Sequence, residues 1–243
     1  MPPRIPTEAD FAPLSTTLPL ALHLPSPPES TTAFLILLHG LGDSEAPFAS
    51  FARAMALPGV LAISVRGVAP LPSALLLPPE GGGGGAGAHF HWGDDLSLDP
   101  RTGDIDADPG FRRASRAIIH QLIRGVLVEK CGWEVDDVIL FGFRQGGSLA
   151  LGLASELRNE TLKGVVSIGG PLPVSMIPTT SARAKSHTEV LLCQLDEDMV
   201  DAVESEFEHV TVARWKRQDV TMPRNRDEML PIMKFLADRL KTV

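Results

Sequence analysis

The stretch from Val138 to Ala154, VILFGFRQGGSLALGLA, combines residue types and spacing that are used to present a reactive group. Its first part is a short apolar run typical of a buried strand, and its second part is typical of a helix. Gly142 and Gly146 lie two residues before and two residues after Arg144. Hydrolases use such a glycine-flanked turn to expose a serine nucleophile at a helix N-terminus, where N–H groups stabilise an oxyanion. Here the residue at the turn is an arginine.

Arginine changes the chemistry that this turn can perform. A guanidinium stays protonated in proteins and only donates hydrogen bonds, so Arg144 cannot attack an acyl carbon. Two roles remain open for it. Arg144 either anchors a carboxylate or phosphate at the helix N-terminus, or pairs with an acid of the chain such as Asp94 or Asp198 and neutralises the site.

Short apolar runs that alternate with helical patterns must position this turn. Because the runs are continuous rather than alternating, they predict strands buried on both faces of a mostly parallel sheet, with helices on both sides. We therefore expect an α/β fold. The predicted strands cover 33–38, 60–65, 137–143, 163–170, 189–194 and 209–215, and the predicted helices cover 44–56, 111–126, 145–158 and 226–240.

Sheets of this kind bind ligands beyond the carboxyl ends of their strands, so the residues that follow each strand carry the information about function. HGLGD (39–43) follows the first buried strand and GFRQGG (142–147) ends the central one. HWGDD (91–95) lies between them, and LDEDMV (195–200) follows a later strand.

In this order and spacing, the four motifs resemble those of the phospholipase/carboxylesterase and acyl-protein thioesterase family of α/β hydrolases. The similarity runs from about Ala33 to Leu240, and the ending MPRNRDEMLPIMKF looks like that of fungal members. The resemblance implies an α/β-hydrolase fold. It also implies a Ser–Asp–His triad in that chain order and an oxyanion hole of backbone N–H groups.

The family's site residues carry over unevenly. Leu41 and Gln145 match the two oxyanion donors, and these act through the backbone. Asp198 matches the acid, although a solvated turn within an acidic cluster also explains it. The nucleophile position holds Arg144, and the approximate position of the histidine holds Met222. The resemblance thus implies a triad of which only the acid remains.

Other side chains of the chain offer weak substitutes for the missing groups. His209 starts the last predicted strand, which places it at the wrong end of the sheet. His39 is expected to organise its loop by hydrogen bonding. Ser148 lies one helical turn beyond the bend, where we expect it to face packed neighbours, and Ser44 is explained as a helix N-cap.

Composition limits the class of protein. The chain has 243 residues, 44% of them apolar, which suits one globular domain. A formal charge of −8 without a Lys/Arg cluster argues against nucleic acid as a partner. Cys131 and Cys193 form no zinc or disulfide pattern, and His89 and His91 lack further ligands, so we expect no metal or cofactor. We find no signal peptide or transmembrane run and expect a cytoplasmic protein.

Two segments depart from the regular pattern. Residues 1–30 contain eight prolines and predict an extended lead-in, in which LPLALHL is a possible edge strand. Residues 31–243 are expected to form the single domain, with a flexible glycine-rich insertion around 78–90.

Three hypotheses about function follow from these residues. The first is a catalytically impaired family member that keeps its pocket and binds a small acyl or anionic ligand. The second is an active serine-type hydrolase of carboxylic esters or thioesters that obtains its base from elsewhere. The third is a purely structural or partner-binding protein. The sequence leaves the ligand and the oligomeric state open.

Overall fold

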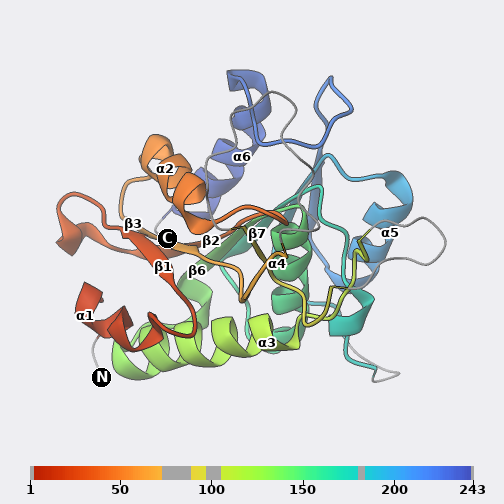
Figure 1. Ribbon diagram of the computed structural model, residues 1–243. Coiled ribbons are helices and arrows are strands. Elements are labelled where there is room, and N and C mark those ends of the chain that lie inside the picture. Colours follow the sequence, from red (N-terminus) through yellow and green to blue (C-terminus); the bar gives the residue numbers. More distant parts are fainter. Residues whose placement is uncertain (1–2, 73–88, 97–104, 180–183, 242–243) are drawn as a thin grey trace, which may run out of the picture.

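A seven-stranded sheet forms the centre of the computed structural model, which describes residues 3–72, 89–96, 105–179 and 184–241 (Figure 1). The strand order is β1-β3-β2-β6-β7-β8-β9, and every neighbouring pair is parallel except β1 with β3. The strands are β1 (Leu20–His23), β2 (Ala33–Leu38), β3 (Val60–Val65), β6 (Val138–Phe143), β7 (Gly164–Ile168), β8 (Val190–Cys193) and β9 (Val210–Ala213). A separate pair joins β4 (Ala69–Pro70) to β5 (Phe90–His91).

The predicted α/β-hydrolase architecture, a mostly parallel sheet with helices on both faces, is confirmed. The apolar runs are buried strands for the reason the sequence suggested: helices cover both of their faces, so both sets of side chains leave water. In Figure 1, α2 (Glu45–Met55) and α6 (Arg226–Arg239) lie above the sheet, and α4 (Gln145–Glu156) lies below it.

The long predicted helix is present below the sheet but has two parts. It starts as α3 (Arg112–Ser115) and continues as η4 (Arg116–Lys130), which has π-type hydrogen bonding. A further helix, α5 (Glu197–Glu206), was missed by the sequence analysis. Its five acidic residues hid the apolar spacing of Val200 and Val203, which are buried against the sheet.

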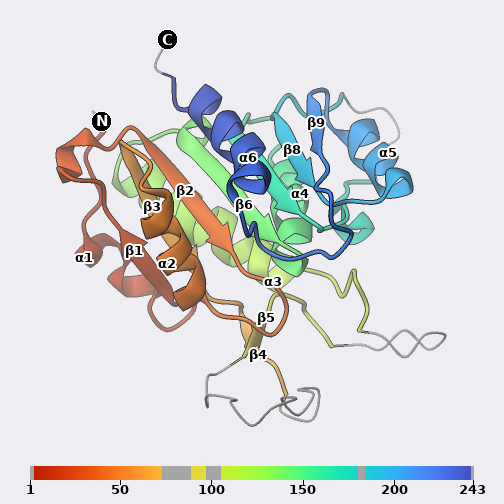
Figure 2. The same cartoon turned by 90° about the horizontal axis from the view of Figure 1, so that it is seen from above.

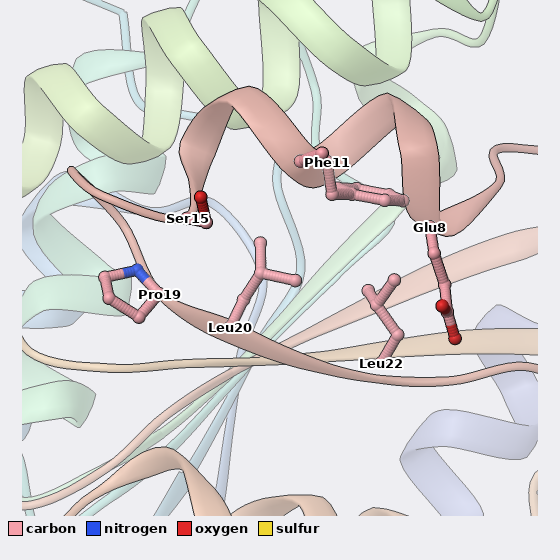
Figure 3. A pocket seen from close by; sticks show the side chains of 7 residues that line it. Glu8, Phe11, Ser15, Pro19, Leu20 and Leu22 are labelled. Atoms are coloured by element: carbon pink, nitrogen blue, oxygen red, sulfur yellow. The ribbon is translucent and has the colours of Figure 1, made fainter.

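The N-terminal segment differs from the predicted extended lead-in. It contains the short helix α1 (Glu8–Phe11), and the possible edge strand is indeed β1. Arg4 donates two hydrogen bonds to Asp10, at 2.8 and 2.7 Å, and Phe11 is buried. Phe11, Leu20 and Leu22 line a small pocket between α1 and β1 (Figure 3). The segment is ordered because these apolar side chains cover one edge of the main core.

The glycine-rich part of the predicted insertion lies outside the described residues as far as residue 88. The residues on either side of it are joined by the β4–β5 pair, whose partners are Ala69 with His91 and Pro70 with Phe90. Within the described ranges, the helices are all too short or too polar to cross a membrane.

Candidate functional site

The carboxyl ends of the parallel strands lie at one edge of the sheet (Figure 2), where HGLGD follows β2, GFRQGG ends β6 and LDEDMV follows β8. HWGDD begins with the last residue of β5 and belongs to the segment that follows this strand. At this edge Leu38 of β2 pairs with Gly142 of β6, and Phe143 pairs with Ile168 of β7. The chain reverses its direction of travel across the sheet between β2 and β6, since β3 lies on one side of β2 and β6 on the other. Such a reversal is where open α/β sheets form their binding crevice.

Arg144 occupies a strained turn between β6 and α4. Its φ of 48° and ψ of −116° are unusual for a residue other than glycine. Flanking glycines make the turn possible: a Cβ on Gly142 would lie 2.1 Å from the carbonyl oxygen of Gly146, and one on Gly146 would lie 2.2 Å from that of Leu38. The Arg144 side chain therefore stands exposed at the N-terminus of a 12-residue helix.

The guanidinium of Arg144 is held by the loop that follows β9. Its Nη2 and Nε atoms donate to the carbonyl oxygen of Val220, at 2.6 and 3.3 Å. Its Cζ atom lies 5.6 Å from the ring centroid of Phe143. Because this partner, the one found among the described residues, is an uncharged carbonyl, the contact leaves the positive charge of the guanidinium uncompensated.

The predicted alternative, in which Arg144 pairs with Asp94 or Asp198, is not found among the described residues. Asp94 accepts hydrogen bonds from the backbone N–H groups of Arg112 and Arg113, at 3.0 and 2.8 Å, and thereby caps α3. Asp198 is exposed in the first turn of α5. Both carboxylates thus lie at helix N-termini, where the helix dipole stabilises negative charge.

Leu41 and Gln145 lie where strand β2 and helix α4 meet. Within the described part of the chain, their backbone N–H groups donate to no partner, whereas the neighbouring Gly42 donates to Phe90 at 2.9 Å. The side-chain oxygen of Gln145 accepts from the backbone N–H of Trp92, at 2.9 Å. The motifs HGLGD, HWGDD and GFRQGG are thus joined, and two backbone donors remain free beside Arg144.

His39 is a structural residue of the same loop. Its ring is fully buried; Nε2 accepts from the backbone N–H of Gly67 at 2.8 Å, and Nδ1 contacts the carbonyl oxygen of Gly40 at 2.7 Å. Its own carbonyl oxygen accepts from the Trp92 indole at 2.8 Å. Burial lowers the pKa of His39 below its usual 6.5, so the ring is neutral and serves to fix the loop.

Met222 lies half-buried in the loop between β9 and α6, four residues before the helix begins. Arg217 fixes this loop. Its guanidinium pairs with Glu228 at 2.9 Å, donates to the carbonyl oxygen of Met222 at 3.2 Å, and stacks on the ring of Trp215 at 4.6 Å. The hydrogen bonds from Arg217 lower the pKa of the Glu228 carboxyl to about 2.

Comparison with known proteins identifies the family of this chain. The sequence profile described as Phospholipase/Carboxylesterase matches residues 22–237. The chain belongs to the phospholipase/carboxylesterase family. An uncharacterized hydrolase of Schizosaccharomyces pombe is 31% identical over 214 residues, which are 85% of this chain and 83% of that protein. The family resemblance inferred from the motifs, including that to fungal members, is thereby confirmed.

Solved structures of similar fold include acyl-protein thioesterase 2 of Zea mays and the carboxylesterase of Bacillus cereus. The first has a TM-score of 0.62 and 20% identity and covers 91% of this chain and 99% of its own. The second has a TM-score of 0.64 and 16% identity and covers 94% and 99%. At these identities the similarity shows the shared fold.

Three residues that the phospholipase/carboxylesterase motifs did not reveal also shape the site. Val220 supplies the acceptor for Arg144, and Arg217 fixes its loop. Gln194, at the end of β8, has a φ of 53° and bonds both the N–H of Trp215 and the carbonyl oxygen of Arg217, at 2.6 and 2.7 Å. Positive φ at Gln194 has no signal in sequence, because glutamine is not a usual residue there.

The remaining predicted substitutes have the structural positions expected from the sequence. His209 immediately precedes β9, at the end of the strand opposite to the site. Ser148 is buried, as expected from its place one turn into α4, and Ser44 is the N-cap residue of α2. In the described ranges, no three His, Cys, Asp or Glu side chains gather in a way that would hold a metal ion.

Proposed function

We propose that this protein is a catalytically silent member of the phospholipase/carboxylesterase family that binds a small acyl carboxylate or other small anion at Arg144. The observation that carries the proposal is the guanidinium itself, which stands on the turn that the family uses for its nucleophile and is bonded to an uncharged carbonyl. A cation there attracts an anion and cannot form an acyl intermediate.

Three neighbouring features support binding of an anion. The N–H groups of Leu41 and Gln145 have no partner among the described residues, and α4 directs its positive end toward the same place. Arg144 uses Nε and Nη2 for Val220, and its Nη1 has no partner in the part of the chain that the structure describes, so Nη1 can donate to a ligand. One structural neighbour, YahD, was solved with malic acid (TM-score 0.60, 15% identity, 90% of this chain and 98% of its own).

Calorimetric titration with butyrate and with malate tests the proposal. We expect Arg144→Gln to weaken binding by about ten- to a hundred-fold, because a hydrogen bond to a charged group contributes about 1.5 to 3 kcal/mol. Arg214→Gln is the matched control, since Arg214 is an exposed arginine paired with Glu197 at 2.9 Å. Equal affinity of the unmodified chain and Arg144→Gln would refute the proposal.

An active ester or thioester hydrolase is the second candidate. The glycine-flanked turn favours it, as do the N–H groups of Leu41 and Gln145, which have no partner within the described ranges. Hydrolysis of 4-nitrophenyl butyrate by Arg144→Ser and by Arg144→Ser/Met222→His separates the two candidates. Under our proposal the single variant stays silent, and adding the histidine raises the rate by about a hundred-fold or more, as general-base catalysis does. Vigorous turnover by Arg144→Ser alone would instead favour the hydrolase.

A further inference from the structure

A second hollow lies on the other helical layer, between α2 and α6, and shares no lining residue with the Arg144 site. Its volume is about 430 Å³, within the usual range of small-molecule sites. In Figure 1, both helices lie on the same side of the sheet, opposite α4. The hollow is lined by Phe51, Ala54, Met55, Pro223, Arg224, Asn225, Arg226, Met229 and Met233.

The floor of this groove is apolar and continuous with the protein core. Phe51, Met55 and Met229 pack against the buried cluster between the sheet and these two helices, yet each stays partly exposed. With Met233, the groove contains three of the seven methionines of the chain. Methionine side chains are flexible and polarizable, which suits surfaces that adapt to apolar ligands of variable shape.

Charge at the rim of the groove runs against the charge of the whole protein. The chain has a formal charge of −8, whereas the charged residues that line the groove are two arginines and no acids. Arg224 pairs with Asp219 at 2.9 Å. Arg226 is exposed and has no ion-pair partner among the described residues. An apolar wall that ends at such a cation selects a ligand whose apolar chain ends in an anionic group.

We infer that this groove binds an anionic single-chain amphiphile, an alkyl chain that ends in a carboxylate or a phosphate. The chain lies along the Phe51, Met55, Met229 and Met233 side chains and loses its contact with water. The acidic head binds Arg226, with the remaining donors of Arg224 beside it. A neutral amphiphile makes only the apolar contacts and lacks the ion pair.

Titration with dodecanoate, dodecyl phosphate and dodecanol, each below its micellar concentration, tests the inference. With 13C-labelled methionine methyl groups, we expect the signals of Met55, Met229 and Met233 to shift. Those of Met176, buried below the sheet, and Met199, exposed on α5, should stay. Comparison of the first two probes distinguishes a fatty acid from a phosphate-headed lipid as the source of the ligand. Unmoved groove methyl groups with every probe would overturn the inference.

Substitutions test the two halves of the groove separately. Arg226→Gln should weaken both anionic probes by about tenfold and leave dodecanol unchanged, because it removes one charge-assisted contact. Arg53→Gln removes an exposed arginine of α2 outside the lining and should change nothing. If dodecanol binds as tightly as dodecanoate, or Arg226→Gln has no effect, the anion selectivity is wrong.

Filling the groove gives a test that does not depend on charge. Ala54 is exposed on the groove wall, so Ala54→Trp should fold normally and abolish the methionine shifts. Ala46→Trp, at an exposed position of the same helix outside the groove, is the matched control. Arg144→Gln should leave the shifts intact, which separates this site from the proposed anion site. Persistent binding by Ala54→Trp would overturn the inference.

Discussion

The two halves of the Arg144 site are built on different principles. One half, the loop after β2 with the start of α4, is defined by the backbone. It has glycines in close contact, a buried histidine, and N–H groups that bond to none of the described residues. The other half, the loops after β8 and β9, depends on side chains such as Arg217 and Gln194. The motifs HGLGD and GFRQGG lie in the backbone half, whereas LDEDMV follows β8 in the other half. Arg144 and Met222, which we propose occupy the positions of the family's nucleophile and histidine, are side chains that the fold itself does not require.

This difference teaches that shape and chemistry are separately encoded in the molecule. The turn at Arg144 is kept because any Cβ at Gly142 or Gly146 collides with backbone atoms within 2.2 Å. A side chain that only performs chemistry carries no such packing constraint, so its replacement leaves the fold unchanged.

Breaking the backbone half should have the largest effect. Gly146→Ala places a methyl group 2.2 Å from the carbonyl oxygen of Leu38 and 2.5 Å from that of His39, so α4 must move away from β2. We expect the free energy of unfolding to fall by about 3 kcal/mol, measured by urea denaturation. Arg144→Ala, two residues away, should change it far less. Similar losses of unfolding free energy in Gly146→Ala and Arg144→Ala would contradict the proposed difference between backbone and side chain.

His39 should dominate the stability of the backbone half near neutral pH. His39→Gln weakens a buried pair of hydrogen bonds and should cost about 2 kcal/mol. Because burial lowers the pKa of His39 below 6.5, the unfolded chain takes up a proton that the folded chain refuses as pH falls below 6.5. The free energy of unfolding should therefore decrease there, and the variant should lose this slope. An unchanged slope would contradict the buried neutral ring.

The side-chain half should stabilise the folded protein less at acidic pH. The folded pKa of Glu228 is about 2 against an ordinary 4.5, so its stabilising effect is complete above 4.5 and is lost as pH falls toward 2. Glu228→Gln should reduce the pH dependence of the free energy of unfolding in this window. Asp227→Asn, at the exposed position next to Glu228, is the control and should leave this pH dependence in place. If both variants lost the pH dependence, the effect could not be assigned to Glu228.

The smallest effect is expected from a change that keeps charge and alters geometry. Arg217→Lys retains the cation but loses the forked donors that bind Glu228 and the Met222 carbonyl. The loop should loosen its hold on Arg144, so the Arg144 Nε–H should exchange faster with water in nuclear magnetic resonance spectra. Arg214→Lys serves as control. Unchanged exchange in Arg217→Lys would show that Val220 is positioned without Arg217.

Sequence reasoning predicted the sheet well because buried parallel strands leave continuous apolar runs, as AFLILL shows. It also predicted the bend at Arg144, since close backbone contacts demand glycine at Gly142 and Gly146. It missed α5, whose buried face consists of few residues among many acids. It also left residues 8–23 largely without structure, because the prolines outweighed the apolar residues that pack on the core.

The side-chain half of the site could not be predicted for a different reason. The contact between Arg144 and Val220 joins residues 76 positions apart through a carbonyl group, which any residue type supplies. The positive φ of Gln194 likewise has no residue signature. Pairings of Arg144 with Asp94 or Asp198 were reasonable from charge alone. Both acids instead lie at helix N-termini, which single-sequence reasoning did not weigh.

Intact-mass spectrometry of the unmodified protein after reaction with a fluorophosphonate and with an activated acyl ester tests the central claim most directly. Our account predicts that the mass stays unchanged, while Arg144→Ser/Met222→His gains one adduct on the new serine. A stoichiometric adduct on the unmodified chain, mapped by peptide analysis to a side chain beside Arg144, would contradict the claim that this site binds without catalysis.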